Sequence, residues 1–280
     1  MSQHYTLRYA SHPDDVKSYD TQRLRKEFLI SNLMKKGEIN MVYSLYDRFI
    51  TGGAVPTSRQ LTLKPFEELK ADFFLERREI GIINVGNSGS VVVDGKTYKM
   101  KYKEALYIGR GAKKIIFKSN NKSKPALFYF NSTNAHTTYP TKLITLKDAD
   151  IVHLGSLKTS NDRQINKLLV HSIVKTCQLQ MGMTELKEGS VWNTMPAHSH
   201  NRRMEVYFYF EVPKGQAVAH FMGQPQETRH IWLQNNEAVI SPSWSIHAGA
   251  GTSNYIFIWG MAGENLDYGD MDGVKISELR

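Results

Sequence analysis

Short apolar stretches, broken by glycine and asparagine, dominate the sequence from about residue 38 onward. Within them β-branched and aromatic residues alternate with polar ones, as in GSVVVDGKTYKM and RRMEVYFYF. Asp94-Gly95, between the apolar positions 91–93 and 97–98, is a strong signal for a two-residue hairpin. Many short strands at near-even spacing favour antiparallel barrels or sandwiches over a βαβ fold. The pattern therefore predicts an all-β protein, preceded by one short helix within residues 20–36.

The strand-rich pattern occurs twice, on the two sides of a polar stretch at 131–165. We predict an N-terminal segment with the short helix (1–36), a first jelly-roll β-barrel (37–160) and a second one (161–280). Two short matches indicate a degenerate repeat, and both segments of the second match are followed by a small-residue turn and an aromatic strand, at 115–117 and 255–259. The matches are Arg77-Arg78-Glu79 with Arg202-Arg203-Met204-Glu205, and Glu104-Ala105-Leu106 with Glu237-Ala238-Val239.

Composition narrows the class of protein. No apolar stretch approaches the roughly 18–20 residues that cross a bilayer, and the polar start gives no sign of a secretory signal. A single cysteine, Cys177, cannot form an internal disulfide, so we expect the cytoplasm. The net charge of +9 suits a nucleic acid or a small anionic substrate. Because the basic residues are scattered and no nucleic-acid-binding motif occurs, we expect the small anion and neither a nucleic-acid nor a membrane partner.

His198-Ser199-His200 has the spacing of a metal-binding pair. Residues i and i+2 of a strand project from one face, so the two imidazoles point together. Glu205 follows at an odd offset, and a turn or bulge after His200 would bring it to the same side. His247 comes from a later segment, PSWSIH, which precedes the turn-rich AGAG. Three imidazoles and one carboxylate leave a position open for water or substrate, as in catalytic metal sites.

The other histidines lack a partner at a metal-like spacing, and we interpret them as surface or hydrogen-bonded residues. His220, which can face the same cavity, lacks such a partner too. The remaining six are His4, His12, His136, His153, His171 and His230.

The repeat predicts that only the second half binds a metal. Counting from the glutamate-alanine pair, Lys114 matches His247. Counting from the arginine pair, Asp72 and Phe74 match His198 and His200. The first half therefore lacks the ligand set, and we expect one metal ion per subunit.

Longer blocks of sequence resemble one family within the cupin superfamily. They include LERREIGIINVG, AHTTYPTK, VWNTMP, RRMEVYFYF, MGQPQETRH, ISPSWSIH and FIWGM. Together they resemble the 5-keto-4-deoxyuronate isomerases, over about residues 20–280. Gly215 and Asn254 fit the two general cupin signatures more loosely.

This resemblance implies a bicupin that binds zinc through His198, His200, Glu205 and His247, usually as a hexamer. It implies an aldose–ketose isomerase of pectin and uronate catabolism. The substrate has an aldehyde at C1, a hydroxyl at C2, a ketone at C5 and a terminal carboxylate. The product is 3-deoxy-D-glycero-2,5-hexodiulosonate. Zinc suits three imidazoles and a carboxylate, although iron(II) or manganese also fits.

Other groups must handle the proton and the carboxylate of such a substrate. Tyr207 and Tyr209 alternate onto the ligand side of their strand, and Glu227 follows a turn near it. We take Tyr207 and Glu227 as the catalytic candidates, with a metal-bound hydroxide as base or a hydride shift as the alternative routes. An arginine suits the carboxylate because its planar fork binds both oxygens. Arg229 is the first choice, followed by the remaining candidates Arg163, Arg202 and Arg203.

Two other functions fit the same ligand set. An iron-dependent cupin dioxygenase would bind iron at the same four residues and consume oxygen. A non-enzymatic sugar-binding cupin would bind the sugar without turnover, and a sensor of this kind should carry a DNA-binding module. No helix-turn-helix pattern occurs in the sequence.

Overall fold

The computed structural model describes residues 2–280, and nearly all of its regular structure is β-strand. The contacts divide the chain into two compact units. The first comprises residues 2–8, 32–149 and 168–180, and the second comprises residues 9–31, 150–167 and 181–280. The predicted all-β class is confirmed. The boundaries predicted at residues 36 and 160 stay predictions, because a grouping of contacts does not test which lengths of chain fold independently.

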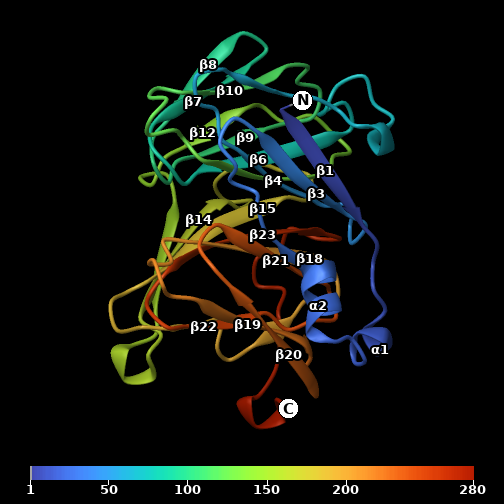
Figure 1. Cartoon of the computed structure of the whole chain (residues 1–280), viewed down its shortest axis with the longest axis vertical. Coiled ribbons are helices and arrows are strands. Elements are labelled where there is room, and N and C mark those ends of the chain that lie inside the picture. The colour runs from blue at the N-terminus through green and yellow to red at the C-terminus, as the bar shows by residue number, and fades with distance from the viewer. Residues whose placement is uncertain (1) are drawn as a thin grey trace. The chain divides into compact units, whose positions relative to one another are not determined.

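The first unit is a sandwich of two sheets, with strands in the orders β1-β3-β4-β11-β6-β9-β12 and β5-β10-β7-β8 (Figure 1). β1 and β3 are parallel, and the other paired neighbours are antiparallel. The strands of the larger sheet are β1 (Gln3–Arg8), β3 (Ile39–Ser44), β4 (Ile50–Ala54), β6 (Arg78–Asn84), β9 (Ala105–Ile108), β11 (Phe128–Asn134) and β12 (Lys142–Ile144). Those of the smaller sheet are β5 (Leu61–Leu63), β7 (Gly89–Val93), β8 (Lys96–Met100) and β10 (Ile115–Ser119).

The interior of the first unit is apolar. Ile80 and Ile82 of β6 pack with Val91 and Val93 of β7, so side chains from the two sheets meet in one core. The hairpin predicted at Asp94-Gly95 is confirmed. Val93 pairs with Lys96, and the two turn residues have φ of 47° and 89°, the left-handed values that a type I′ turn requires.

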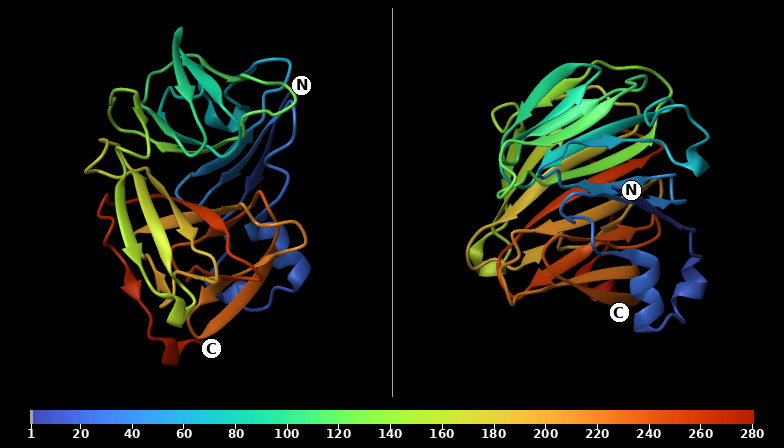
Figure 2. Two further views of the ribbon diagram at one scale, coloured as in Figure 1. Left: turned by 90° about the vertical axis from the view of Figure 1, so that its left-hand side faces the viewer. Right: turned by 45° about the horizontal axis from the view of Figure 1, so that its top comes forward.

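The second unit repeats this arrangement, with sheets in the orders β13-β14-β15-β23-β18-β21-β2 and β16-β22-β19-β20 (Figure 2). Its larger sheet contains β2 (Leu29–Ile30), β13 (Asp150–Leu154), β14 (Arg163–Leu169), β15 (Gln180–Leu186), β18 (Arg203–Phe210), β21 (Glu237–Ser241) and β23 (Ile256–Gly263). Its smaller sheet contains β16 (Trp192–Asn193), β19 (Val218–Gln224), β20 (Glu227–Leu233) and β22 (Ala248–Gly251). A separate ribbon joins β17 (His198–Ser199) to β24 (Asp272–Gly273).

Strand register confirms the predicted repeat. Aligning Arg78 with Arg203 also aligns Ile80 with Glu205. Aligning Ala105 with Ala238 also aligns Ile108 with Ser241. If both alignments hold, a pair between Ile80 and Ile108 in the first unit should correspond to a pair between Glu205 and Ser241 in the second. Both pairings are present, between β6 and β9 and between β18 and β21. The two sequence matches, made separately, therefore describe one common geometry.

Two details of the predicted repeat are wrong. Residues 115–117 lie on β10 of the smaller sheet, whereas the counterpart of β23 in the larger sheet is β11. The register also makes Ile80, not Glu79, the counterpart of Glu205, in agreement with a count from Arg77 and Arg202. The positions matching His198 and His200 are then Phe73 and Leu75, not Asp72 and Phe74. These side chains cannot bind a metal, so the conclusion about the first half is unchanged.

The helices are short, and the longest lies where the sequence predicted one. α2 (Thr21–Phe28) begins after Asp20, whose side chain accepts a hydrogen bond from the backbone of Arg23. It ends well before residue 36 because Leu29–Ile30 turn into strand β2 and pair with β21. The others are α1 (Pro13–Val16) and the 3₁₀ turns Glu67–Leu69, Leu157–Thr159 and Ile276–Glu278. Within residues 2–280 no helix has the length and apolarity to cross a membrane.

Candidate metal centre and cavity

The four residues predicted to bind a metal converge in the second unit. His198 lies on β17 and Glu205 on β18, and His247 directly precedes β22. One ligand atom from each of His198, His200, Glu205 and His247 lies within 4.8 Å of the others. Among residues 2–280, no other group of histidine, cysteine, aspartate or glutamate side chains is this compact.

Local structure explains how Glu205 joins the two histidines. A turn at Asn201-Arg202 separates β17 from β18, as predicted from the odd spacing. The Oε2 atom of Glu205 then lies 3.2 Å from Nε2 of His200 and 3.0 Å from Nε2 of His247. Nε2 of His247 is also 3.0 Å from Nε2 of His198. Three imidazole nitrogens and one carboxylate oxygen therefore face one point, the arrangement that a tetrahedral or octahedral metal requires.

The protonation states also fit a metal. Burial, together with His247 and His200, lowers the pKa of His198 to about 2, so its imidazole is neutral. Burial alone would raise the pKa of Glu205, but His247 and His200 outweigh it and lower this pKa well below its usual range. Metal ligands must be deprotonated. His198 and Glu205 are thus already in the forms that bind a cation.

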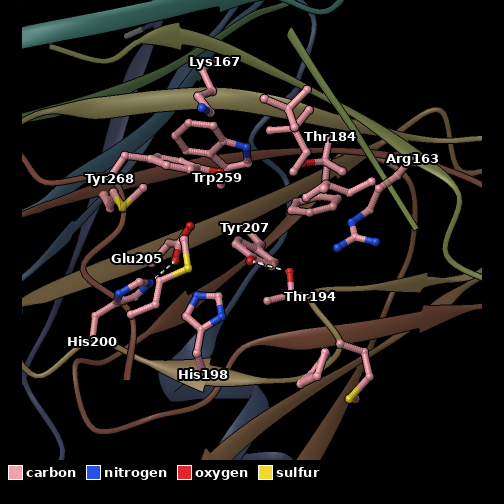
Figure 3. A pocket seen from close by; sticks show the side chains of 18 residues that line it. Arg163, Lys167, Thr184, Thr194, His198, His200, Glu205, Tyr207, Trp259 and Tyr268 are labelled. Carbon is pink, nitrogen blue, oxygen red and sulfur yellow. Dashed lines mark hydrogen bonds and ion pairs between the residues drawn. The ribbon is translucent and has the colours of Figure 1, made fainter. Parts of the chain in front are cut away.

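A cavity of about 300 Å³ opens beside the cluster, which is small for a ligand site but adequate for a six-carbon acid. Its polar lining is Arg163, Lys167, Thr184, Thr194 and Tyr207, together with the ligands His198, His200 and Glu205. Its apolar lining includes Met195, Phe257, Trp259, Met261, Tyr268 and Met271. In Figure 3, Arg163 and the ligands His198 and His200 lie on opposite sides of Tyr207.

Tyr207 lies at the centre of this lining, on the same face of β18 as Glu205, as the strand alternation predicted. Its hydroxyl shares a 2.8 Å hydrogen bond with Oγ1 of Thr194. Burial and the nearby Glu205 carboxylate raise the pKa of Tyr207 well above 10. The phenol therefore keeps its proton at ordinary pH and has a hydrogen to donate.

Two cations reach the cavity from β14. Nη1 of Arg163 donates to the carbonyl of Asn161 at 2.9 Å, and among residues 2–280 no carboxylate pairs with this guanidinium. Lys167 is already engaged, with Nζ 2.8 Å from Asp150 and 4.9 Å from the ring centroid of Tyr268. Of the two, Arg163 is the one available to an anionic ligand.

Several residues predicted for the site do not line the cavity. Glu227 and Arg229 form an ion pair with each other at 2.6 Å on β20, the edge strand of the smaller sheet. Arg202 pairs with Asp270, and Arg203 is buried and bonded to backbone carbonyls. The hydroxyl of Tyr209 shares a 2.8 Å hydrogen bond with Nδ1 of His220, and both side chains are fully buried. Roles for Glu227 and Arg229 in catalysis and binding have no geometric support here.

Five further residues line the cavity and were not predicted from the sequence: Lys167, Thr184, Thr194, Trp259 and Tyr268. One signal was available, because Arg163, Ile165 and Lys167 alternate on β14 and all line the cavity. The indole ring of Trp259 packs directly against Gly182 of β15, and a Cβ atom at position 182 would overlap the ring. Its Nε1–H is buried and has no partner within residues 2–280, so it can donate to a bound oxygen.

Comparison with known proteins gives a family. Residues 28–273 match the model of the KduI/IolB family. The chain is 63% identical, over the full length of both proteins, to a 4-deoxy-L-threo-5-hexosulose-uronate ketol-isomerase of Formosa agariphila. It is 56% identical, again over both full lengths, to 4-deoxy-L-threo-5-hexosulose-uronate ketol-isomerase 1 of Bacteroides thetaiotaomicron.

Solved structures show the same fold at much lower identity. An IolB-like protein of Salmonella typhimurium superposes with a TM-score of 0.65 at 15% identity, covering 81% of this chain and 86% of that one. An oxalate decarboxylase of Bacillus subtilis gives 0.54 at 9% identity, covering 80% of this chain and 71% of that one. These likenesses support the two-sandwich architecture alone.

Proposed function

Because the chain belongs to the KduI/IolB family, we propose that it is a metal-dependent ketol-isomerase acting on 4-deoxy-L-threo-5-hexosulose uronate in uronate and pectin catabolism. The product is 3-deoxy-D-glycero-2,5-hexodiulosonate. The observation that carries the proposal is the four-ligand cluster at one side of a small cavity, with an unpaired guanidinium lining the same cavity.

We propose one zinc ion per chain, held by His198, His200, Glu205 and His247. Three imidazoles and one carboxylate that converge within 4.8 Å support this assignment, since they form a donor set that suits zinc. A metal held by these residues would supply Lewis acidity to the reacting oxygens of the substrate. The chain itself sets the position of these oxygens through the shape of the cavity.

Arg163 is proposed to bind the substrate carboxylate. The substrate has a reacting carbonyl end and a carboxylate end, and the cavity has a ligand cluster and a guanidinium on opposite sides of Tyr207 (Figure 3). Arg163 is partly buried, so its pairing with a carboxylate is little screened by solvent. The unpaired Nε1–H of Trp259 offers a further donor to a substrate oxygen.

Tyr207 is proposed to donate a hydrogen bond to the reacting oxygens, because its raised pKa keeps the phenol protonated. Apart from the four ligands, no carboxylate or imidazole lines the described cavity. This favours direct transfer of hydrogen over removal by a base. The hydrogen on C2 then moves with its electron pair to C1, while the C2 hydroxyl proton passes to the C1 oxygen. Deuterium at C2 should therefore appear at C1 of the product, and its loss to solvent would instead indicate a base.

An assay under nitrogen with metal analysis tests the proposed function. We expect the purified chain to interconvert the deoxy-keto-uronate and its diulosonate at equal rates in nitrogen and in air. Turnover that requires oxygen, with iron at the four ligands, would identify the dioxygenase alternative. Tight binding of the sugar without turnover would identify a binding protein.

We also propose the cytoplasm as the compartment and a homo-hexamer as the assembly. The first rests on the single, buried thiol of Cys177, and the second on the resemblance to the isomerase family. Light scattering of the purified protein would test the hexamer.

A further inference from the structure

The strap formed by residues 264–274 runs beside residues 197–202, a segment that includes the metal ligands His198 and His200. Tyr268 and Met271 of this strap line the cavity. Gly273 pairs with His198, and the backbone N–H of Val274 donates to Ala197 at 2.9 Å. The strap is thus both a wall of the cavity and a neighbour of the ligand-bearing segment.

His200 makes its outer hydrogen bond to this strap. Its Nδ1–H donates to the carbonyl of Asp270 at 2.6 Å. With the proton on Nδ1, the lone pair is on Nε2, the nitrogen that lies 3.2 Å from Glu205. Outer hydrogen bonds of this kind fix the tautomer and the ring orientation of a metal-binding histidine. The position of the Asp270 carbonyl therefore matters for metal binding.

Two arginines hold that carbonyl in place. The guanidinium of Arg202 contacts both carboxylate oxygens of Asp270, with Nε at 2.8 and 2.7 Å. The side chain of Arg203 is 1% exposed and donates to the carbonyls of Asp267 and Asp270 at 2.6 and 3.0 Å. Asn265 adds a hydrogen bond to the Asp270 carboxylate at 2.7 Å. Asp270 is thus held at its side chain and at its backbone.

The first unit contains the same arginine pair without a metal site. Arg77, the counterpart of Arg202, forms an ion pair with Glu76 and donates to the carbonyls of Leu69 and Lys70. Arg78, the counterpart of Arg203, is buried and donates to backbone carbonyls, including that of Ser132. In both halves, therefore, an arginine of this pair binds the backbone carbonyls of a neighbouring loop. This contact is structural and does not depend on a substrate. In the second half, the loop that is held also contacts a metal ligand.

We infer that the Arg202–Asp270 ion pair is a latch that keeps the Asp270 carbonyl on Nδ1 of His200 and so slows release of the metal. Arg202 and Asp270 are positioning residues that act through His200, and Arg202 does not contact the substrate. This inference rests on the proposed metal site but not on the isomerase reaction.

Chelator competition on the full-length, metal-loaded protein tests the latch. We expect Arg202→Met and Asp270→Asn each to weaken zinc affinity by about 10- to 100-fold and to speed zinc release. Arg202→Lys should restore part of the loss because it keeps the charge. The double variant should lose little more than either single variant, since both remove one interaction. Arg77→Met is the matched control and should keep the wild-type zinc affinity.

Circular dichroism separates loss of the latch from loss of the fold. The isosteric Asp270→Asn variant should stay folded at the temperature of the titration. Wild-type zinc affinity in Arg202→Met and Asp270→Asn overturns the inference, most clearly if Arg202→Met instead raises KM for the substrate. Equal losses in Arg77→Met would also overturn it. Failure of the wild-type chain to bind zinc would instead contradict the proposed function.

Discussion

The two halves share one topology but fill their interiors differently. In the first unit Ile80 lies at the position that Glu205 occupies in the second, and it packs in an apolar core. In the second unit Glu205, Tyr207 and His220 lie between the sheets. Buried ionisable groups are costly unless they are paired or bind a metal. The comparison teaches that one fold can enclose an apolar core in the first half and a cluster of ionisable side chains in the second.

The largest expected effect comes from removing a ligand that the first half lacks. Glu205→Gln or His247→Ala should lower kcat/KM by about a thousandfold or more, because a Lewis acid contributes several kcal/mol to the transition state. Ile80→Val, at the matching position of the first half, is the control and should keep metal and activity. Near-normal turnover by Glu205→Gln would break the comparison.

Metal removal should affect the two halves unequally. At a free metal concentration of about a thousand times Kd, binding stabilises the folded state by about 4 kcal/mol. Hydrogen exchange should therefore speed up in peptides of β18, β19 and β22 when the metal is removed. Peptides of β6, β7 and β10 should change little. Equal loss of protection in both sets would show that the metal does not act on one half alone.

Tyr207→Phe should lower kcat by about a hundredfold while the metal content stays unchanged, since it removes a positioned donor from the reacting oxygens. Tyr129 of the first half is also buried, with its hydroxyl accepting from Asn131 at 3.0 Å. Tyr129→Phe is the matched control, and its kcat should be unchanged. Full activity of Tyr207→Phe would remove this tyrosine from the mechanism.

Arg163→Met should raise KM for the uronate by about 10- to 100-fold, the loss expected for hydrogen bonds to a charged group. Because the carboxylate is remote from the reacting carbons, kcat should fall much less. The KM of Arg163→Lys should lie between those of Arg163→Met and the wild type. An unchanged KM would mean that the carboxylate is bound elsewhere.

The smallest effect concerns acid stability of the metal-free protein. Burial, followed by His247, lowers the pKa of His220 to about 3, against about 6.5 in the unfolded chain. The unfolded state therefore binds the extra proton, and stability is lost as the pH falls from about 6.5 toward 3. Between pH 7.5 and 5, His220→Gln should lose about 2 kcal/mol less unfolding free energy than the wild type. The exposed His171→Gln is the control, and an identical pH slope in all three proteins would contradict the burial argument.

The sequence predicted the fold class, the repeat and the family, and these predictions are confirmed. The spacing of His198, His200 and Glu205 also predicted the turn that brings their side chains together. Zinc, the hexamer and the roles of the site residues stay predictions.

The rest of the cavity depends on packing between distant strands. Arg163 and Lys167 come from β14, whereas Trp259 comes from β23, and no local pattern joins them. Glu227 and Arg229 were chosen because a turn precedes them, but the edge position of β20 pairs them with each other. Arg202 was a candidate for binding the substrate carboxylate, but it pairs with Asp270, which is distant in the sequence.

Titration of metal back into the stripped protein, followed by anaerobic assay, tests the central claim most directly. We expect no isomerisation without metal, a linear rise in activity as zinc is added, and saturation at one zinc ion per chain. Activity in the metal-free protein, or saturation at two ions per chain, would contradict the single metal site in the second half.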